Sequence, residues 1–214
     1  MTAPDGPSAL AGIDTVARET VDRLQTYVEL LKKWQGSTNL VSPNSVPSIW
    51  NRHVADSARL VALFPDALRW VDLGSGGGFQ ATVVAILLIG RQGAAEHLIE
   101  SDQRKCAFLR QAIRATGAPA EVYTGRIESV LGAWREPVDM ISSRALAPLS
   151  RLFSLSEPLF EAGARGAFHK GLDFEEEISE ASKSWDADLV IHESKTESAG
   201  VILEVRHLAR RSAA

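Results

Sequence analysis

Apolar positions recur at two different spacings along the chain. Over residues 14–35 and about 45–63 they return every three or four positions, which predicts two amphipathic helices. From residue 69 on, short apolar runs alternate with helical patterns, which is typical of βαβ units around a mostly parallel sheet. We expect strands at 69–73, 96–99, 121–123, 138–141, 166–169, 188–191 and 201–205, and helices at about 79–89 and 103–115.

This order predicts an α/β fold in which a helical cap precedes a Rossmann-like sheet. Residues 1–66 would form the N-terminal cap and residues 67–214 the sheet domain, packed together as one compact unit. A chain of 214 residues with 45% hydrophobic residues can bury one sizeable core, so we expect a single domain-sized body. We also expect a monomer, although length and composition do not settle the oligomeric state.

Composition narrows the setting of the protein. The longest apolar run, 81–89, is too short to span a bilayer, and residues 1–10 lack the basic and apolar regions of a signal peptide. The lone cysteine, Cys106, cannot form an internal disulfide or a cysteine metal cluster, and we expect it to be a buried packing group. We therefore expect a cytoplasmic protein with no membrane association and no metal site.

Charge is unevenly distributed. The net charge of −4 argues mildly against a nucleic-acid partner, because phosphates favour a basic protein. Basic residues nevertheless gather at 104–114 and at 206–211, so a local basic face is compatible with the sequence. Such clusters are more often plain solvated surface.

The most informative stretch is a glycine loop at 71–79, Val-Asp-Leu-Gly-Ser-Gly-Gly-Gly-Phe. A strand ends there and a helix begins near Phe79. Glycines suit such a turn because a ligand can approach the backbone where a β-carbon would collide. The turn also leaves free N–H groups at the start of the helix.

Spacing in and after this loop discriminates between cofactors. Glu100 ends the next expected strand, where a carboxylate can accept hydrogen bonds from both ribose hydroxyls. Gly74-x-Gly76-x-Gly78 is tighter than the G-x-G-x-x-G of dinucleotide binders, whose helix must hold a pyrophosphate. S-adenosylmethionine has no phosphate, and Asp72 suits its ammonium group. The pattern therefore favours S-adenosylmethionine.

Several motifs, in order, resemble the RsmG (GidB) family of bacterial 16S rRNA guanine-N7 methyltransferases. The glycine loop resembles the family's motif I, and the likeness spans about residues 20–207. Gln80 and Ala81 depart from it, because the family usually has Pro and then Gly there. The other matching elements are Trp34 with Asn39-Leu40, Arg52-His53-x-x-Asp56-Ser57, Lys105 with Phe108-Leu109, Gly125-Arg126-Ile127-Glu128, Ser143-Arg144-Ala145 and His169-Lys170-Gly171.

The resemblance implies roles at the matching positions. It implies a cofactor site at Gly74, Phe79, Ile127, Glu128 and Arg144, to which the loop pattern adds Asp72, Gly76, Gly78 and Glu100. Candidates for contacting RNA are Arg52, His53, Lys105, Arg126 and Lys170. For His53 and Asp56, which share a helix face, a structural pair is an equally good interpretation.

The resemblance implies methyl transfer from S-adenosylmethionine to N7 of a guanosine in small-subunit (16S) rRNA, as free RNA or within a ribosomal particle. N7 carries a lone pair and no proton, so attack needs no general base, and we assign no catalytic acid or base. Two alternatives are a small-molecule methyltransferase on the same scaffold and a non-catalytic interaction module, because fold alone does not fix function. A large apolar pocket under a lid would favour the first alternative, and a basic-rimmed cleft would favour RNA.

Overall fold

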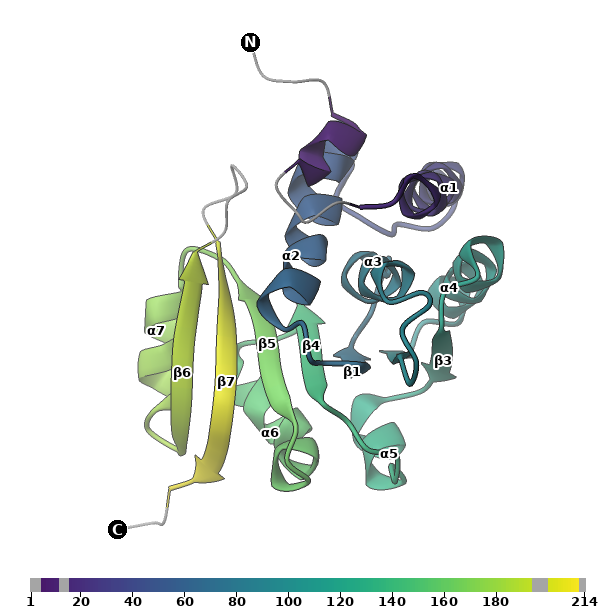
Figure 1. Ribbon diagram of the computed structural model, residues 1–214. Helices are drawn as coiled ribbons and strands as arrows, with labels where there is room; N and C mark the ends of the chain where they lie inside the picture. The colour runs from purple at the N-terminus through teal and green to yellow at the C-terminus, as the bar shows by residue number, and fades with distance from the viewer. Residues whose placement is uncertain (1–4, 12–15, 194–199, 212–214) are drawn as a thin grey trace.

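The computed structural model describes residues 5–11, 16–193 and 200–211. Its centre is a seven-stranded sheet in the order β3-β2-β1-β4-β5-β7-β6 (Figure 1). The first five strands run parallel, and β7 lies antiparallel to both β5 and β6. The strands are β1 Arg69–Leu73, β2 Ala95–Glu100, β3 Ala120–Thr124, β4 Met140–Arg144, β5 Arg165–Lys170, β6 Trp185–Glu193 and β7 Val201–Arg210.

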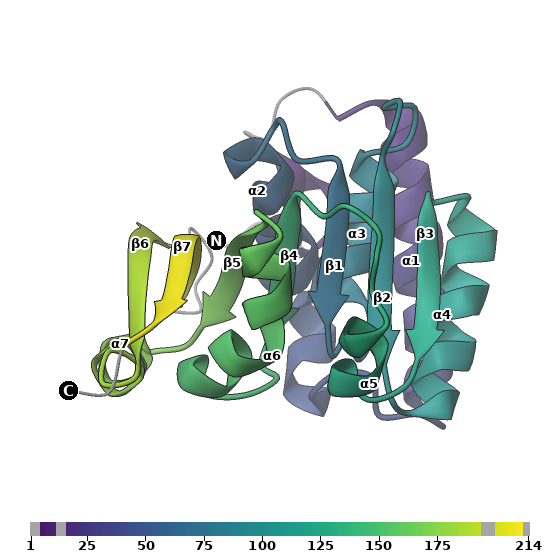
Figure 2. The same ribbon diagram turned by 90° about the horizontal axis from the view of Figure 1, so that it is seen from below.

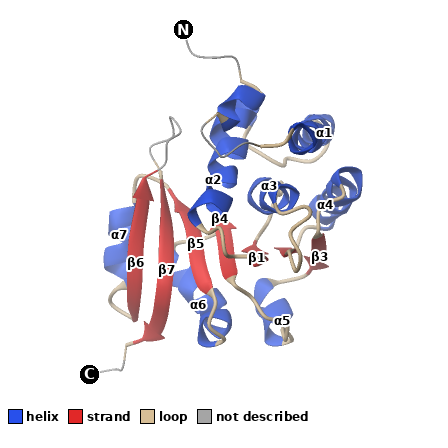
Figure 3. Cartoon of the chain, in the orientation of Figure 1, coloured by secondary structure: helices blue, strands red, loops and turns tan. Residues whose placement is uncertain are grey.

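Helices cover both faces of the sheet, which confirms the α/β prediction (Figure 3). Helices α1 to α4 pack on one face, and α5 to α7 pack on the other through a second cluster of buried side chains. The helices are α1 Arg18–Gln35, α2 Ala55–Leu63, α3 Phe79–Leu87, α4 Gln103–Thr116, α5 Ile127–Gly132, α6 Leu149–Glu161 and α7 Phe174–Ala181.

The N-terminal segment differs in detail from the two expected helices. Helix α1 begins at Arg18, and Asp14, the expected start, lies outside the described residues. The expected helix at 45–63 is three elements: η2 (Pro43–Ser48), the π-turn η3 (Trp50–Val54) and α2. The break has a physical reason, because Pro47 has no N–H to donate within a continuous α-helix.

This segment packs closely on the sheet domain. Tyr27 of α1 contacts the rings of Phe79 and Phe108 at centroid distances of 5.5 and 6.2 Å. The same cluster of buried residues includes side chains of α1, α3 and α4. The division at residue 66/67 remains a prediction. No described helix combines the length and the apolar character that crossing a membrane requires.

The carboxyl ends of the parallel strands meet at one edge of the sheet (Figure 2). Chain order reverses beside β1, because the chain moves outward to β2 and β3 and then returns to β4 on the other side of β1. In open α/β sheets a ligand crevice forms at such a reversal, outside the carboxyl ends of the strands.

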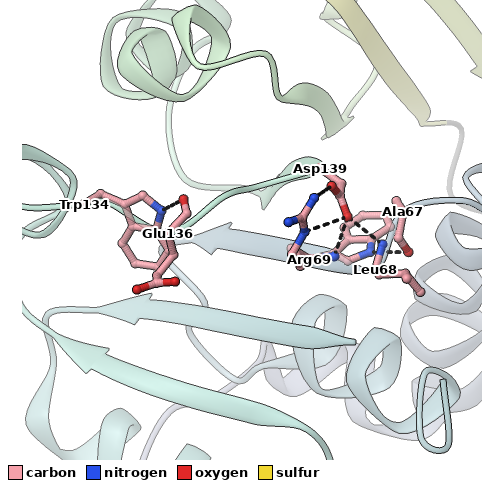
Figure 4. Close-up of polar contacts among 7 residues, drawn as sticks. Ala67, Leu68, Arg69, Trp134, Glu136 and Asp139 are labelled. Atoms are coloured by element: carbon pink, nitrogen blue, oxygen red, sulfur yellow. Dashed lines mark hydrogen bonds and ion pairs between the residues drawn. The ribbon is translucent and has the colours of Figure 1, made fainter. Parts of the chain in front are cut away.

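At the amino ends of the parallel strands, Asp139 lies just before β4 and contacts the start of β1 (Figure 4). Its Oδ2 accepts hydrogen bonds from the backbone N–H groups of Leu68 and Arg69 at 3.0 and 2.9 Å, and its Oδ1 lies 2.5 Å from Nη2 of Arg69. Asp139 thereby ties the start of β1 to the start of β4. Strand β4 begins at Met140, two residues later than the expected strand at 138–141.

Glu96 of β2 is an unusual core residue, because it is only 1% exposed and neither carboxyl oxygen has a hydrogen-bond partner among the described residues. Burial, with a contribution from the Asp72 carboxylate, raises the pKa of Glu96 well above its ordinary value of 4.5. Between the ordinary and the raised pKa the folded chain binds a proton that the unfolded chain has released. Stability therefore falls as pH rises through that interval.

We predict that Glu96→Met raises the free energy of unfolding at pH 8 by about 1–3 kcal/mol, because it removes a buried polar group without a partner in the described part of the chain. Thermal unfolding at pH 5 and pH 8 measures this, and the gain should be larger at pH 8. Glu96→Gln is the matched control, since it removes the titration but keeps a polar group. A lower Tm for Glu96→Met at both pH values would contradict the prediction.

Candidate functional site

A cavity of about 710 Å³ opens at the carboxyl ends of β1, β2 and β4, where the strand order predicts a ligand site. It brings together eight of the nine expected cofactor residues: Asp72, Gly74, Gly76, Phe79, Glu100, Ile127, Glu128 and Arg144. Gly78 lies in the loop but does not line the cavity. The wall also includes four of the expected RNA-contacting residues, Arg52, His53, Lys105 and Arg126.

The glycine loop takes a backbone conformation that other residues rarely adopt. Gly76 and Gly78 have φ angles of 55° and 72°. A β-carbon on Gly78 would lie 2.4 Å from Leu109 Cδ2, whereas one on Gly76 would meet no atom closer than 3.8 Å. Gly78 is therefore required by packing within the protein, and Gly76 leaves its space open beside the cavity.

Tyr27 holds the loop from the side of the N-terminal segment. Its hydroxyl is buried and donates a hydrogen bond of 2.5 Å to the Gly77 carbonyl oxygen, fifty residues away in the sequence. Burial raises the pKa of Tyr27 well above its ordinary value, so the hydroxyl keeps its proton. Tyr27 is not among the residues expected from the sequence, because its apolar helical position predicts only core packing.

Asp72 ends the buried part of β1 and lines the cavity while remaining 3% exposed. Its Oδ1 accepts a hydrogen bond from the Ser142 hydroxyl at 2.7 Å. Burial raises the pKa of Asp72 to about 6, against the opposing effect of the Ser142 hydrogen bond. At neutral pH the carboxyl group is therefore mostly ionised, which suits a cationic ligand group. Ser142, which no sequence motif indicated, orients it.

Glu100 fixes the geometry of the loop with one carboxylate. Its Oε2 accepts from the Gly76 N–H at 2.8 Å, and its Oε1 accepts from the N–H groups of Ser101 and Asp102 at 2.7 and 2.8 Å. Each carboxylate oxygen has two lone pairs, so Oε1 is fully used and one acceptor position, on Oε2, remains for a ligand hydroxyl.

Arg144 is the last residue of β4 and lines two cavities. Its Nη2 donates to the Arg52 carbonyl oxygen at 3.2 Å, and its Nη1 is buried with no partner among the described residues. Ala145 then has a φ angle of 52°, which turns the chain so that Leu146 covers Gly74. The strand-end position of Arg144 agrees with the sequence prediction.

The second cavity, of about 640 Å³, adjoins the first. Both are lined by Arg52 and by the turn at 144–147, so this turn separates them. Asp56 of α2, His169 and Lys170 of β5 and Glu177 of α7 complete much of its wall.

His53 stacks on Phe79 with a centroid distance of 4.5 Å. Neither ring nitrogen has a hydrogen-bond partner among the described residues. Burial, with smaller effects from the Arg144 and Arg52 cations, lowers the pKa of His53 to about 3, so the ring is neutral. His53 contributes an aromatic face rather than a positive charge to this wall.

Lys170 is turned inward. Its side chain is 6% exposed, and Nζ lies 2.8 Å from the Ala147 carbonyl oxygen and 2.5 Å from Glu177 Oε2. The same Glu177 oxygen accepts from the Leu149 N–H at 2.6 Å. Lys170 and Glu177 thus brace the turn at 144–149. The RNA contact expected for Lys170 remains a prediction, and the Lys170 ammonium group already has two partners within the protein.

Other charged groups expected near the site also have protein partners. Glu128 forms an ion pair with Arg151 at the rim of the first cavity. In the C-terminal basic cluster, Arg206 pairs with Glu204 and Arg210 with Glu157, at 2.9 and 2.6 Å. The positive rim of the cavity therefore comes from Arg52, Lys105 and Arg126, not from the C-terminal cluster.

The sequence is similar to known proteins along almost its whole length. The pattern of the family described as rRNA small subunit methyltransferase G (GidB) matches residues 20–208. A relative from Parvibaculum lavamentivorans, named ribosomal RNA small subunit methyltransferase G, is 50% identical over 94% of this chain and 88% of its own. A relative of the same name from a Bradyrhizobium species is 45% identical over 98% of this chain and 94% of its own.

Solved structures share the fold at low sequence identity. Cofactor-bound Rv0187 from MTB superposes with a TM-score of 0.62 at 14% identity, covering 96% of this chain and 99% of that one. An O-methyltransferase from Bacillus cereus in complex with SAH superposes with a TM-score of 0.58 at 16% identity, covering 92% and 94%.

We predict that Lys170→Met lowers the free energy of unfolding by about 2–3 kcal/mol, because it leaves the partly buried Glu177 without its cation. The matched control is Lys183→Met, which breaks an exposed pair with Glu180 and should change stability by less than about 0.5 kcal/mol. Urea unfolding measures both. Equal stability of the two variants would show that Lys170 is not a brace and is available to a ligand.

Proposed function

Because the chain belongs to the rRNA small subunit methyltransferase G family, we propose that it transfers a methyl group from S-adenosylmethionine to N7 of a guanosine in small-subunit (16S) rRNA. One observation carries this proposal. Three motifs that are separate in the sequence line the same cavity: the glycine loop, the segment after β3 and the end of β4. The basic residues that the family resemblance implies as RNA contacts line this cavity too, except Lys170.

The residues of the first cavity fit S-adenosylmethionine. Its volume lies in the range of small-molecule sites. The open space beside Gly76 accommodates a close ligand backbone, and the anionic Asp72 suits the ammonium group. Glu100 retains one free acceptor position, on Oε2, for a ribose hydroxyl. When bound, this cofactor supplies an electrophilic methyl group on a sulfonium.

The chain's own contribution is positioning. Guanine N7 has an in-plane lone pair and carries no proton, so the residues around the cavity need not remove one. Tyr27 and Glu100 fix the loop that holds the cofactor, while the turn after Arg144 sets the wall that the target base must meet. Holding two reactants in line can account for several kcal/mol of a barrier, on the order of 7–11 kcal/mol in ideal cases. No catalytic acid or base is assigned.

The rim supports an RNA substrate rather than a small molecule. Arg52, Lys105 and Arg126 line the opening, and positive side chains attract phosphates. A guanine within folded RNA must be unstacked to enter, and the second cavity next to the first offers room for it. We propose that the protein acts as a monomer in the cytoplasm, on free rRNA or a ribosomal particle.

We predict that the purified protein with labelled S-adenosylmethionine forms 7-methylguanosine in 16S rRNA or small subunits, detected by mass spectrometry of nucleosides.

Gly76→Val should abolish cofactor binding in calorimetry, because a branched side chain occupies the open space at a positive φ angle. Gly36→Val is the matched control, since Gly36 has an ordinary φ of −67° and a β-carbon there would meet no atom within 4 Å. A different methylated nucleoside, or unchanged affinity of Gly76→Val, would refute the corresponding assignment.

A further inference from the structure

Gln80, which follows the glycine loop directly after Phe79, makes specific contacts inside the protein. It lies in the first turn of α3, lines the first cavity and is 3% exposed. Its Oε1 accepts a hydrogen bond from Nδ1 of His169 at 2.8 Å.

His169 lies at the carboxyl end of β5 and lines the second cavity. Because Nδ1 donates to Gln80, a neutral ring carries its lone pair on Nε2, which is then an acceptor. Nε2 is buried and has no partner among the described residues.

Arg144 presents the complementary group on the neighbouring strand. Arg144 and His169 are paired in the β4–β5 register, so their side chains stand side by side on one face of the sheet. Within the described residues, Nη1 of Arg144 is a buried donor without a partner, next to a buried acceptor without a partner. Burying a polar group without a partner lowers stability, so a small side-chain movement that pairs these two atoms relieves both penalties.

The charges around His169 keep it neutral. Burial lowers its pKa to about 3, and the cations of Arg144 and of Arg59 in α2 act in the same direction with smaller effects. A hydrogen bond with the backbone of Asp56 in α2 opposes them with a smaller effect, and Gln80 of α3 carries no charge. Nε2 is therefore an acceptor throughout the physiological pH range.

We propose that Gln80 is a positioning residue of this chain, which holds His169 in the tautomer whose Nε2 accepts a hydrogen bond from Arg144 Nη1 in the catalytic complex. The guanidinium is thereby fixed in the wall shared by the two cavities. The effect on catalysis rests on the proposed methyl transfer, whereas the tautomer of His169 does not depend on it.

The test replaces Gln80 with Glu. A carboxylate next to Nδ1 stabilises the imidazolium, raises the pKa of His169 and converts Nε2 into a donor that faces the Arg144 cation. The kcat of Gln80→Glu for methylation of small subunits should fall by about tenfold between pH 8.5 and pH 6, which corresponds to about 1.4 kcal/mol in the barrier. Relative to Gln92→Glu, an exposed control with the same charge change, the pH profile should be distinctly steeper.

Two further variants separate positioning from general damage. Gln80→Leu removes the acceptor without adding charge, so kcat should fall at all pH values while the cofactor Kd stays unchanged. Adding His169→Gln to Gln80→Glu removes the titrating ring, so the pH dependence should disappear. Profiles of Gln80→Glu and Gln92→Glu that coincide would overturn the proposal.

Nitrogen NMR of the imidazole rings gives a readout that needs no activity. The wild-type His169 should carry its proton on Nδ1 and remain neutral at pH 5, whereas Gln80→Glu should shift its titration upward. A wild-type protein that shows this tautomer but methylates no rRNA would refute the proposed function and leave the tautomer assignment intact. A proton on Nε2 would refute the role of Gln80.

Discussion

The carboxylate of Glu100 is the constraint from which the rest of the site follows. It accepts hydrogen bonds from the backbone N–H groups of Gly76, Ser101 and Asp102, and so joins the end of β2 to the glycine loop after β1. A loop rich in left-handed glycines has a large conformational entropy when free, so it needs such fixed contacts to keep one shape. Tyr27 supplies the second contact, from α1. The N-terminal segment therefore helps to shape the first cavity, whose wall includes Arg52 and His53, and is not only a cover for the sheet.

Ionisable groups on the α2/α3 face share a second physical feature, which is burial without full compensation. Glu96 and Asp72 have raised pKa values, whereas His53 and His169 have lowered ones. In each case burial is the largest cause, and it disfavours the charged form. Unpaired buried polar atoms cost stability, and natural proteins retain them mainly at functional sites. Glu96 differs from the others because it lines neither cavity. The stability lost by burying Glu96 is therefore not explained by a role in either cavity.

Local patterns made much of this predictable. The alternation of strands and helices, the glycine loop, Glu100 and the strand-end Arg144 all depend on neighbours within a few residues, and the structure places them as expected. Contacts between distant segments were not predictable. In the sequence Tyr27 looks like an ordinary core residue, but the fold places its hydroxyl against the Gly77 carbonyl oxygen. Lys170 looks like a surface cation, but the fold places it against Glu177. The prediction of one continuous helix over residues 45–63 was wrong, because it followed the apolar periodicity and gave too little weight to Pro47.

The turn after Arg144 links these features into one mechanism of positioning. It forms the wall between the two cavities, its Leu146 covers Gly74 of the glycine loop, and Lys170 with Glu177 holds it from the other face of the sheet. Since Ala145 adopts a left-handed φ angle that is costly for a residue with a β-carbon, the turn needs these contacts to persist. A change in either cavity must therefore displace packed or ion-paired groups and not a free loop. For the methyl transfer that we propose, which requires alignment rather than proton transfer, such rigidity at the shared wall is the property that the fold has to supply.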